Sequence, residues 1–335
     1  MSAENREASD LDVRVTQRFV APAERVFDAW LDPESLTRWM FGPAMREEEI
    51  MRLQIDPREG SGFSFRVRRG GEVLDHVGDY AVVERPLRLE FGWGIAGQSS
   101  SRVSVRITPA AQGCELELIH RLEPEWRDFA ARTRSGWARM LDMLDRNLCS
   151  ARQAKAMPAQ SFGRVDAGNV LHMERLLPAP PGQAWNWFAE RAPRAHWLAE
   201  GDIPLSGDGP VDLLFDHAEL SPYVLPAPEA FRRYEGSRMH GRLVVCEASR
   251  VLAFTWGEAQ GDGEVRFELS PRGEATALVL THTKLSDMEM RIGVAAGWHT
   301  HLAMLLPRMQ GAAPPAFWPL HMRLREEYAA RFAIA

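Results

Sequence analysis

Histidines at three places in the sequence could do chemistry. His301 falls on the apolar stripe of a segment with helical spacing, where the first half of the chain has Met140. A titratable group would thus enter an otherwise apolar interior. Such a histidine could orient a ligand or act as a general base, or it could be buried and satisfied by a carbonyl or a water. His120 and His282 occupy equivalent positions on matching predicted strands, on the same face as the apolar residues. This recurrence favours a structural role at the end of a strand.

The sequence holds no familiar catalytic or metal-binding motif. There is no G-x-S-x-G elbow, Cys/His pair, phosphate-binding loop, dinucleotide fingerprint or H-E-x-x-H helix. His299 and His301 are two residues apart, whereas a metal pair on a helix needs a spacing of i, i+4. Asp75 and His76 are adjacent on a predicted strand and face opposite sides, so with Asp79 they make a poor triad. We therefore assign no catalytic residue, no metal and no cofactor from the sequence.

Two segments with helical spacing, 161 residues apart, would position the candidate side chains. Their apolar residues recur at i, i+3, i+4, i+7 and i+11, which predicts one buried stripe on each helix. The positions are Trp137, Met140, Leu141, Leu144 and Leu148 in the first segment and Trp298, His301, Leu302, Leu305 and Met309 in the second. We expect one amphipathic helix to close each half of the chain.

Alternating hydrophobic residues predict a sheet ahead of each helix. Phe63, Phe65 and Val67 alternate with polar residues, and the same period of two recurs in several later segments. This pattern indicates antiparallel strands that are covered on one side only. Segments of the second half match the first at offsets of 158 to 163 residues, which indicates a tandem repeat.

The predicted fold class is therefore α+β, in two similar domains. Each domain is a curved antiparallel sheet of about six or seven strands around a long C-terminal helix, with two short helices near its start. The first domain is expected over residues 11–152, followed by a linker over 153–168. The second, more divergent domain is expected over 169–312. Residues 313–335 are expected to add a helix that packs on the second domain.

Length, composition and charge exclude several functional classes. The chain has 335 residues, of which 45% are hydrophobic and 26% charged, as expected for two globular domains. A net charge of −6, spread through both halves, leaves no basic stripe for a nucleic acid and no polybasic membrane anchor. No stretch approaches the roughly 18 apolar residues that span a bilayer. Three scattered cysteines and a polar N-terminus without a signal peptide predict a cytoplasmic protein.

Several of these segments together resemble the START-like (SRPBCC) superfamily. The resemblance is carried by Ala21–Trp30 with Trp39, by Gly78–Tyr80, by Glu84–Trp93 and by the closing helix with Gly136–Trp137. Within the superfamily, the first half is similar to homologues of the C-terminal domain of the heat-shock-protein-90 ATPase activator. The resemblance implies two tandem helix-grip domains, in which each sheet wraps its C-terminal helix and leaves an apolar cavity. It implies no single activity.

The implied cavities would be lined by aromatic and aliphatic side chains from both halves, because large apolar pockets are the usual binding sites. The candidates are Trp39, Phe63, Phe65, Tyr80, Trp93, Trp137, Met140 and Leu141 in the first domain and Trp197, Trp256, His282, Trp298, His301, Leu302 and Leu305 in the second. A stripe of core aromatic residues has the same appearance in a sequence. Each of these residues could therefore belong to the core instead.

We expect the chain to bind a hydrophobic small molecule in such a cavity, a protein partner, or both. The branch that it resembles suggests a stress-response or chaperone-accessory role. The alternative is a cyclase- or hydrolase-type enzyme that acts on a lipophilic substrate in the second cavity, where His301 would orient it. A second inward acid or hydroxyl within hydrogen-bond reach of His301 would favour the enzyme, whereas a dry pocket would favour binding. A third possibility is that the first domain has filled its cavity and serves as a scaffold. Periodicity carries no information on the oligomeric state.

Overall fold

The chain divides into two compact units in the computed structural model, which describes residues 12–41, 45, 47–98, 100–151, 162–257 and 263–333. Unit 1 comprises residues 1–155 and 222–225, and unit 2 comprises residues 156–221 and 226–335. The expected second domain is therefore interrupted, because 222–225 belong to unit 1. Most of the expected linker lies outside the described residues, but its residues 164 and 165 form a strand.

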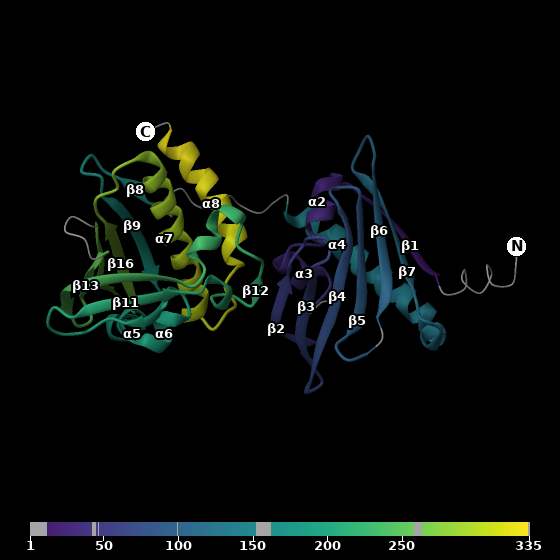
Figure 1. Ribbon diagram of the computed structural model, residues 1–335, viewed down its shortest axis with the longest axis horizontal. Coiled ribbons are helices and arrows are strands. Elements are labelled where there is room, and N and C mark those ends of the chain that lie inside the picture. The colour runs from purple at the N-terminus through teal and green to yellow at the C-terminus, as the bar shows by residue number, and fades with distance from the viewer. Residues whose placement is uncertain are drawn as a thin grey trace, which may run out of the picture. The chain divides into compact units, whose positions relative to one another are not determined.

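Unit 1 is built on one antiparallel sheet whose seven consecutive strands run β1-β7-β6-β5-β4-β3-β2 (Figure 1). The two-residue strand β12 (Tyr223–Val224) adds to β2 in a parallel sense. Inward residues alternate with outward ones, as Phe63, Phe65 and Val67 do on β3, because successive side chains of a strand point to opposite faces. The strands are β1 (Asp12–Phe19), β2 (Glu48–Ile55), β3 (Gly62–Arg69), β4 (Glu72–Glu84), β5 (Arg88–Ile95), β6 (Ser101–Pro109) and β7 (Cys114–Arg121).

Helices cover the inward face of this sheet. The short helices are α2 (Ala23–Asp28) and α3 (Pro33–Trp39), and the long helix α4 (Ala130–Ala151) follows the 3-10 turn η1 (Pro124–Phe129). Asp32 caps α3 by accepting a hydrogen bond from the backbone N–H of Glu34 at 3.0 Å, and Pro33 occupies the first turn, where its missing N–H is not needed. The stripe of α4 is buried as predicted, with Leu141 and Leu144 fully enclosed.

Unit 2 repeats this plan with the strand order β10-β11-β13-β14-β15-β16-β9-β8. Its strands are β8 (Arg164–Val165), β9 (Leu171–Leu177), β10 (Glu200–Asp202), β11 (Pro210–Phe215), β13 (Ser237–Glu247), β14 (Val251–Trp256), β15 (Gly263–Arg272) and β16 (Ala275–His282). Its helices are α5 (Pro181–Ala189), α6 (Arg191–Ala195), the 3-10 turns η3 (His217–Glu219) and η4 (Glu229–Tyr234), the long α7 (Met288–Met309) and α8 (Phe317–Phe332). The α+β architecture of two tandem helix-grip domains is confirmed.

The appended helix α8 lies along α7, as Figure 1 shows. It buries Phe317, Trp318, Leu324 and Tyr328. The phenol oxygen of Tyr328 accepts a hydrogen bond from the backbone N–H of Gly163 at 2.8 Å. In consequence α7 is covered on two faces, with the sheet on one and α8 on the other.

None of the helices in the described residues is long and apolar enough to cross a membrane.

Candidate functional site

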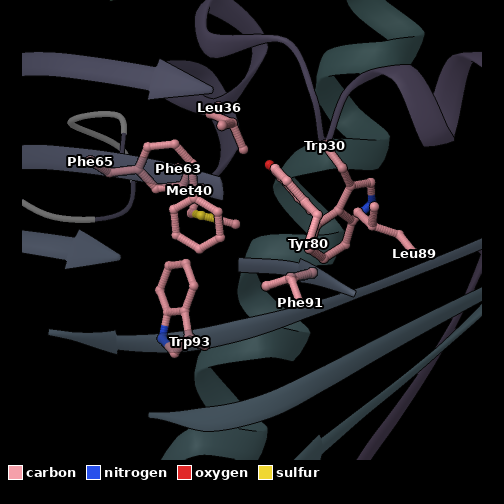
Figure 2. A pocket seen from close by; sticks show the side chains of 9 residues that line it. All are labelled: Trp30, Leu36, Met40, Phe63, Phe65, Tyr80, Leu89, Phe91 and Trp93. Carbon is pink, nitrogen blue, oxygen red and sulfur yellow. The ribbon is translucent and has the colours of Figure 1, made fainter. Parts of the chain in front are cut away.

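An apolar cavity lies between the sheet of unit 1 and its helices (Figure 2). Phe63, Phe65, Tyr80 and Trp93, four of the predicted residues, line it. Five further residues complete the lining: Trp30, Leu36, Met40, Leu89 and Phe91. Their sequence signals are the alternation on β5 for Leu89 and Phe91, and the repeated aromatic position at Trp30.

The cavity is small because its walls are packed against each other. Its volume is about 10 Å³, which is room for about one water molecule. The rings of Phe63 and Phe65 stack with their centroids 4.4 Å apart, and Trp30 meets Phe91 at 6.1 Å. The apolar cavity implied by the resemblance is thus nearly closed in unit 1. A bound molecule larger than water must displace side chains.

Two of the lining residues carry polar atoms into these apolar surroundings. The indole N–H of Trp30 is buried and has no hydrogen-bond partner among the described residues. Burial raises the pKa of the Tyr80 phenol, so it stays protonated and able to donate. In Figure 2 the Tyr80 oxygen is directed toward Leu36. A buried N–H without a partner costs about 1–3 kcal/mol.

A glycine on β4 lets the wall of the cavity close. A β-carbon at Gly78 would lie 1.8 Å from the carbonyl oxygen of Gly92 and 2.6 Å from the tip of the Phe63 ring. The first contact is with backbone, which cannot move aside easily. Gly78 therefore permits the close approach of β4 and β5 beside the cavity.

The other predicted residues of unit 1 are core or support rather than lining. The indole N–H of Trp39 donates to the carbonyl of Ala29 at 3.1 Å. Met140 and Leu141, on α4, are buried in the core of unit 1. Trp137 donates from its indole N–H to Nδ1 of His120 at 3.0 Å. This bond ties the long helix to strand β7.

Unit 2 contains the same hydrogen bond between the long helix and a strand. Trp298 on α7 donates to Nδ1 of His282 on β16 at 2.9 Å, and Trp197 donates to the carbonyl of Trp187 at 2.7 Å. Burial lowers the pKa of both His120 and His282 to about 4, so each is a neutral acceptor. The two histidines thus have a structural role that is repeated in both units.

The remaining predicted residues of unit 2 lie around His301. Leu302 and Leu305 are fully buried in the core, and the Trp256 ring meets that of Trp298 at 5.3 Å. Nδ1 of His301 donates to the carbonyl of Trp197 at 2.9 Å. Burial, with a smaller contribution from nearby His217 and His321, lowers the pKa of His301 to about 3. His301 is therefore neutral and held by a carbonyl, the structural arrangement considered from the sequence.

His217, which is close to His301, and Glu235, which contacts His217, were not predicted. The His217 ring lies 5.7 Å from that of His301, and its Nδ1 is 3.3 Å from Oε2 of Glu235. Glu235 also accepts hydrogen bonds from the backbone N–H of His217 and, at 2.6 Å, from the indole N–H of Trp318. Burial opposes ionisation, but these donors hold the pKa of Glu235 below its usual value. Neither residue belongs to a periodic segment, so the sequence carries no signal for this pair.

Comparison with known proteins places both units in one family. The family model described as "Activator of Hsp90 ATPase homolog 1-like protein" matches residues 20–148 and 178–308. No curated protein matches the chain.

Solved structures similar to the chain cover one or both units. A protein from Bordetella parapertussis is 39% identical over 52% of this chain and 94% of its own, with a TM-score of 0.43. DynU16, from the dynemicin biosynthetic locus, is 20% identical over 89% of this chain and 99% of its own, with a TM-score of 0.34. An AHSA1-like protein from Aeromonas hydrophila is 21% identical over 44% and 97%, with a TM-score of 0.37.

Proposed function

Because the chain belongs to the family of Activator of Hsp90 ATPase homolog 1-like proteins, we propose that it is a binding protein for a hydrophobic small molecule. The molecule is held in the interior of unit 1, between β3, β4 and β5 on one side and α3 on the other. The observation that carries this proposal is the aromatic cavity with two polar groups among nine lining residues. Such a site favours a largely apolar molecule with one oxygen acceptor.

The energetics support a ligand with that acceptor. An oxygen that reached the Trp30 indole N–H would give a partner to a group that is buried without one. Entry requires a lining residue to move, and Met40 is suited to this because its unbranched thioether side chain adapts easily. Met40 directly follows the short helix α3. The site is thus one that opens when the molecule enters.

Titration with the fluorescent probe N-phenyl-1-naphthylamine tests the proposal. We expect Met40→Ala to widen the cavity and to strengthen binding on the order of tenfold, because less displacement is needed. Met40→Trp should fill the space and abolish binding to unit 1. Leu118→Ala is the matched control, because Leu118 is fully buried on β7 but does not line the cavity. Equal affinities for Met40→Ala and Leu118→Ala would refute the assignment of the site.

One observation favours a protein partner as a second candidate. An open hollow of about 610 Å³ lies over β2 to β5 of unit 1, and its lining includes Gln54, Ser64, Asp79 and Gln98. Its mixture of polar groups and glycines suits a peptide segment better than a lipophilic molecule. Failure of every variant to bind the probe, together with loss of a protein complex in Ser64→Arg, would favour this function.

The enzymatic alternative concerns unit 2. The acid nearest to this alternative is Glu235, but it contacts His217, whose ring lies 5.7 Å from that of His301, and it is not shown within hydrogen-bond reach of His301. In addition, the ring of Phe317 lies 4.3 Å from that of His217 and 5.1 Å from that of His301. The Phe317 ring therefore occupies space beside both histidines that a substrate would need.

A further inference from the structure

The first turn of α8 fills a slot in unit 2 that is walled by histidine rings. Phe317 is 4% exposed, and its ring contacts those of His217 and His301 and stacks at 8° on that of His321. Trp318 closes the slot beside it at 5.1 Å. Three imidazoles and one indole thus contact the Phe317 ring within the core of unit 2.

The imidazoles leave acceptors beside the ring of Phe317. His301 uses Nδ1 for the carbonyl of Trp197, and His217 directs Nδ1 to Glu235. The Nε2 atoms of both have no hydrogen-bond partner among the described residues. Because a carbonyl only accepts, His301 carries its proton on Nδ1, and its Nε2 presents a lone pair. Its low pKa keeps it in that form near pH 7.

We propose that this slot is a binding site for an aromatic molecule with a hydroxyl or N–H donor, and that Phe317 is its internal occupant. The aromatic walls accept the flat ring, and Nε2 of His301 accepts the donor hydrogen. Phenylalanine has the ring but no donor, so it fills the slot without using the acceptors. The inference deepens the proposed function by adding a second site, in the other unit and with a different ligand chemistry.

Glu235 helps to hold the first turn of α8, and with it Phe317, in place. Its carboxylate receives the Trp318 indole N–H at 2.6 Å and also orients His217. The hydroxyl of Ser221 donates to the carbonyl of Pro314, three residues before Phe317. Trp318→Phe removes this bond together with part of one wall of the slot, while the three histidine rings remain, and the closed state is weakened. A ligand that competes with Phe317 then binds more tightly, since less of its binding energy is spent on opening the slot.

The test compares 2-naphthol, which has a donor, with 2-methoxynaphthalene, which has none, in calorimetric titrations of the full chain. We expect Trp318→Phe to bind 2-naphthol on the order of tenfold more tightly than the wild type. We expect Phe317→Ala to prefer 2-naphthol over the methyl ether by a similar factor. Adding His301→Leu to Phe317→Ala should abolish that preference.

Controls separate this site from an ordinary packing defect. Tyr328→Phe removes the hydrogen bonds of α8 to Gly163 and to Nδ1 of His299, far along the helix from the slot, and should leave the affinity for 2-naphthol unchanged. If Phe317→Ala does not fold, Trp318→Phe carries the same pair of titrations. Equal binding of the two compounds, or an equal gain in Tyr328→Phe, would overturn the inference. Tight binding that survives Met40→Trp in the Trp318→Phe background distinguishes this site from the cavity of unit 1.

Discussion

At the scale of single residues, the two units share one hydrogen bond. In each unit a tryptophan on the long helix donates to a buried histidine on the strand that precedes that helix, β7 in unit 1 and β16 in unit 2. The bond lengths are 3.0 Å for Trp137 to His120 and 2.9 Å for Trp298 to His282. Each bond satisfies a group that burial would otherwise leave without a partner. The repeated histidines are thereby explained by their support of the helix.

Trp298→Phe should destabilise unit 2 by about 1–3 kcal/mol, because it leaves Nδ1 of His282 buried without its donor. Urea unfolding followed by circular dichroism measures the loss. The matched control is Trp256→Phe, because Trp256 is only partly buried and its indole N–H makes no hydrogen bond among the described residues. Losses of equal size in the two variants would contradict the role given to the bond.

Gly78→Ala should destabilise unit 1 far more than Gly92→Ala. A β-carbon at Gly78 meets backbone atoms of Gly92, whereas one at Gly92 meets first the end of the Asp79 side chain, which can turn away. Thermal unfolding of both variants tests this difference. A smaller fall in Tm for Gly78→Ala than for Gly92→Ala would show that the strands do not approach as closely as described.

At the scale of elements, α3 decides the shape of the cavity in unit 1. It carries Leu36 and leads into Met40, and its start depends on the Asp32 cap. Asp32→Ala should cost about 1 kcal/mol of stability. Asp32→Asn keeps the acceptor, and because burial raises the pKa of Asp32, the neutral side chain should be tolerated. Chemical denaturation compares the two variants, and equal losses would argue against a cap.

The sequence predicted elements well where one face of an element is buried. The stripes that begin at Trp137 and Trp298 mark α4 and α7, and alternation marks the strands. The starts of both helices were missed, because Ala130–Arg134 are largely exposed and add no apolar stripe. The second buried face of α7, with His299 and Thr300, was also missed. That face exists only because α8 packs on it, and this contact leaves no local pattern.

The candidate site was predicted less completely than the fold. The alternation of side chains along the strands predicted that Phe63, Phe65 and Trp93 face the interior. It could not distinguish residues that line the cavity from residues that are packed in the core. The width of the cavity depends on how closely its rings pack, and the Phe63 ring packs directly against Gly78. The polar pair of His217 and Glu235 comes from irregular segments, where no periodicity predicts which residues meet.

At the scale of the whole molecule, the two units should differ in their response to acid. Mainly through burial, four histidines of unit 2 have lowered pKa values, about 4 for His282 and His321 and about 3 for His299 and His301. In unit 1 burial lowers the pKa of His120 in the same way, to about 4. Between pH 6.5 and 4 the unfolded chain binds more protons than the folded one at these sites. The free energy of unfolding therefore decreases as the pH is lowered through this window, by up to about 1.4 kcal/mol per pH unit for each histidine.

Unit 2 should accordingly lose protection before unit 1 when the pH is lowered from 6.5 to 4.5. Hydrogen exchange followed by mass spectrometry on the full chain, corrected for intrinsic exchange rates, resolves the two units. His301→Leu removes one of the four groups and should reduce the acid sensitivity of unit 2. Equal loss of protection in both units would contradict the assignment.

The central claim is that unit 1 holds a hydrophobic small molecule, and native mass spectrometry of gently purified protein tests it most directly. The wild type should carry a lipophilic adduct at a ratio of one to one, which denaturation releases for identification. Met40→Trp, with the cavity filled, should lack that adduct while keeping its fold by circular dichroism. An adduct of equal occupancy in Met40→Trp, or bare mass in the wild type under every gentle condition, would contradict the claim.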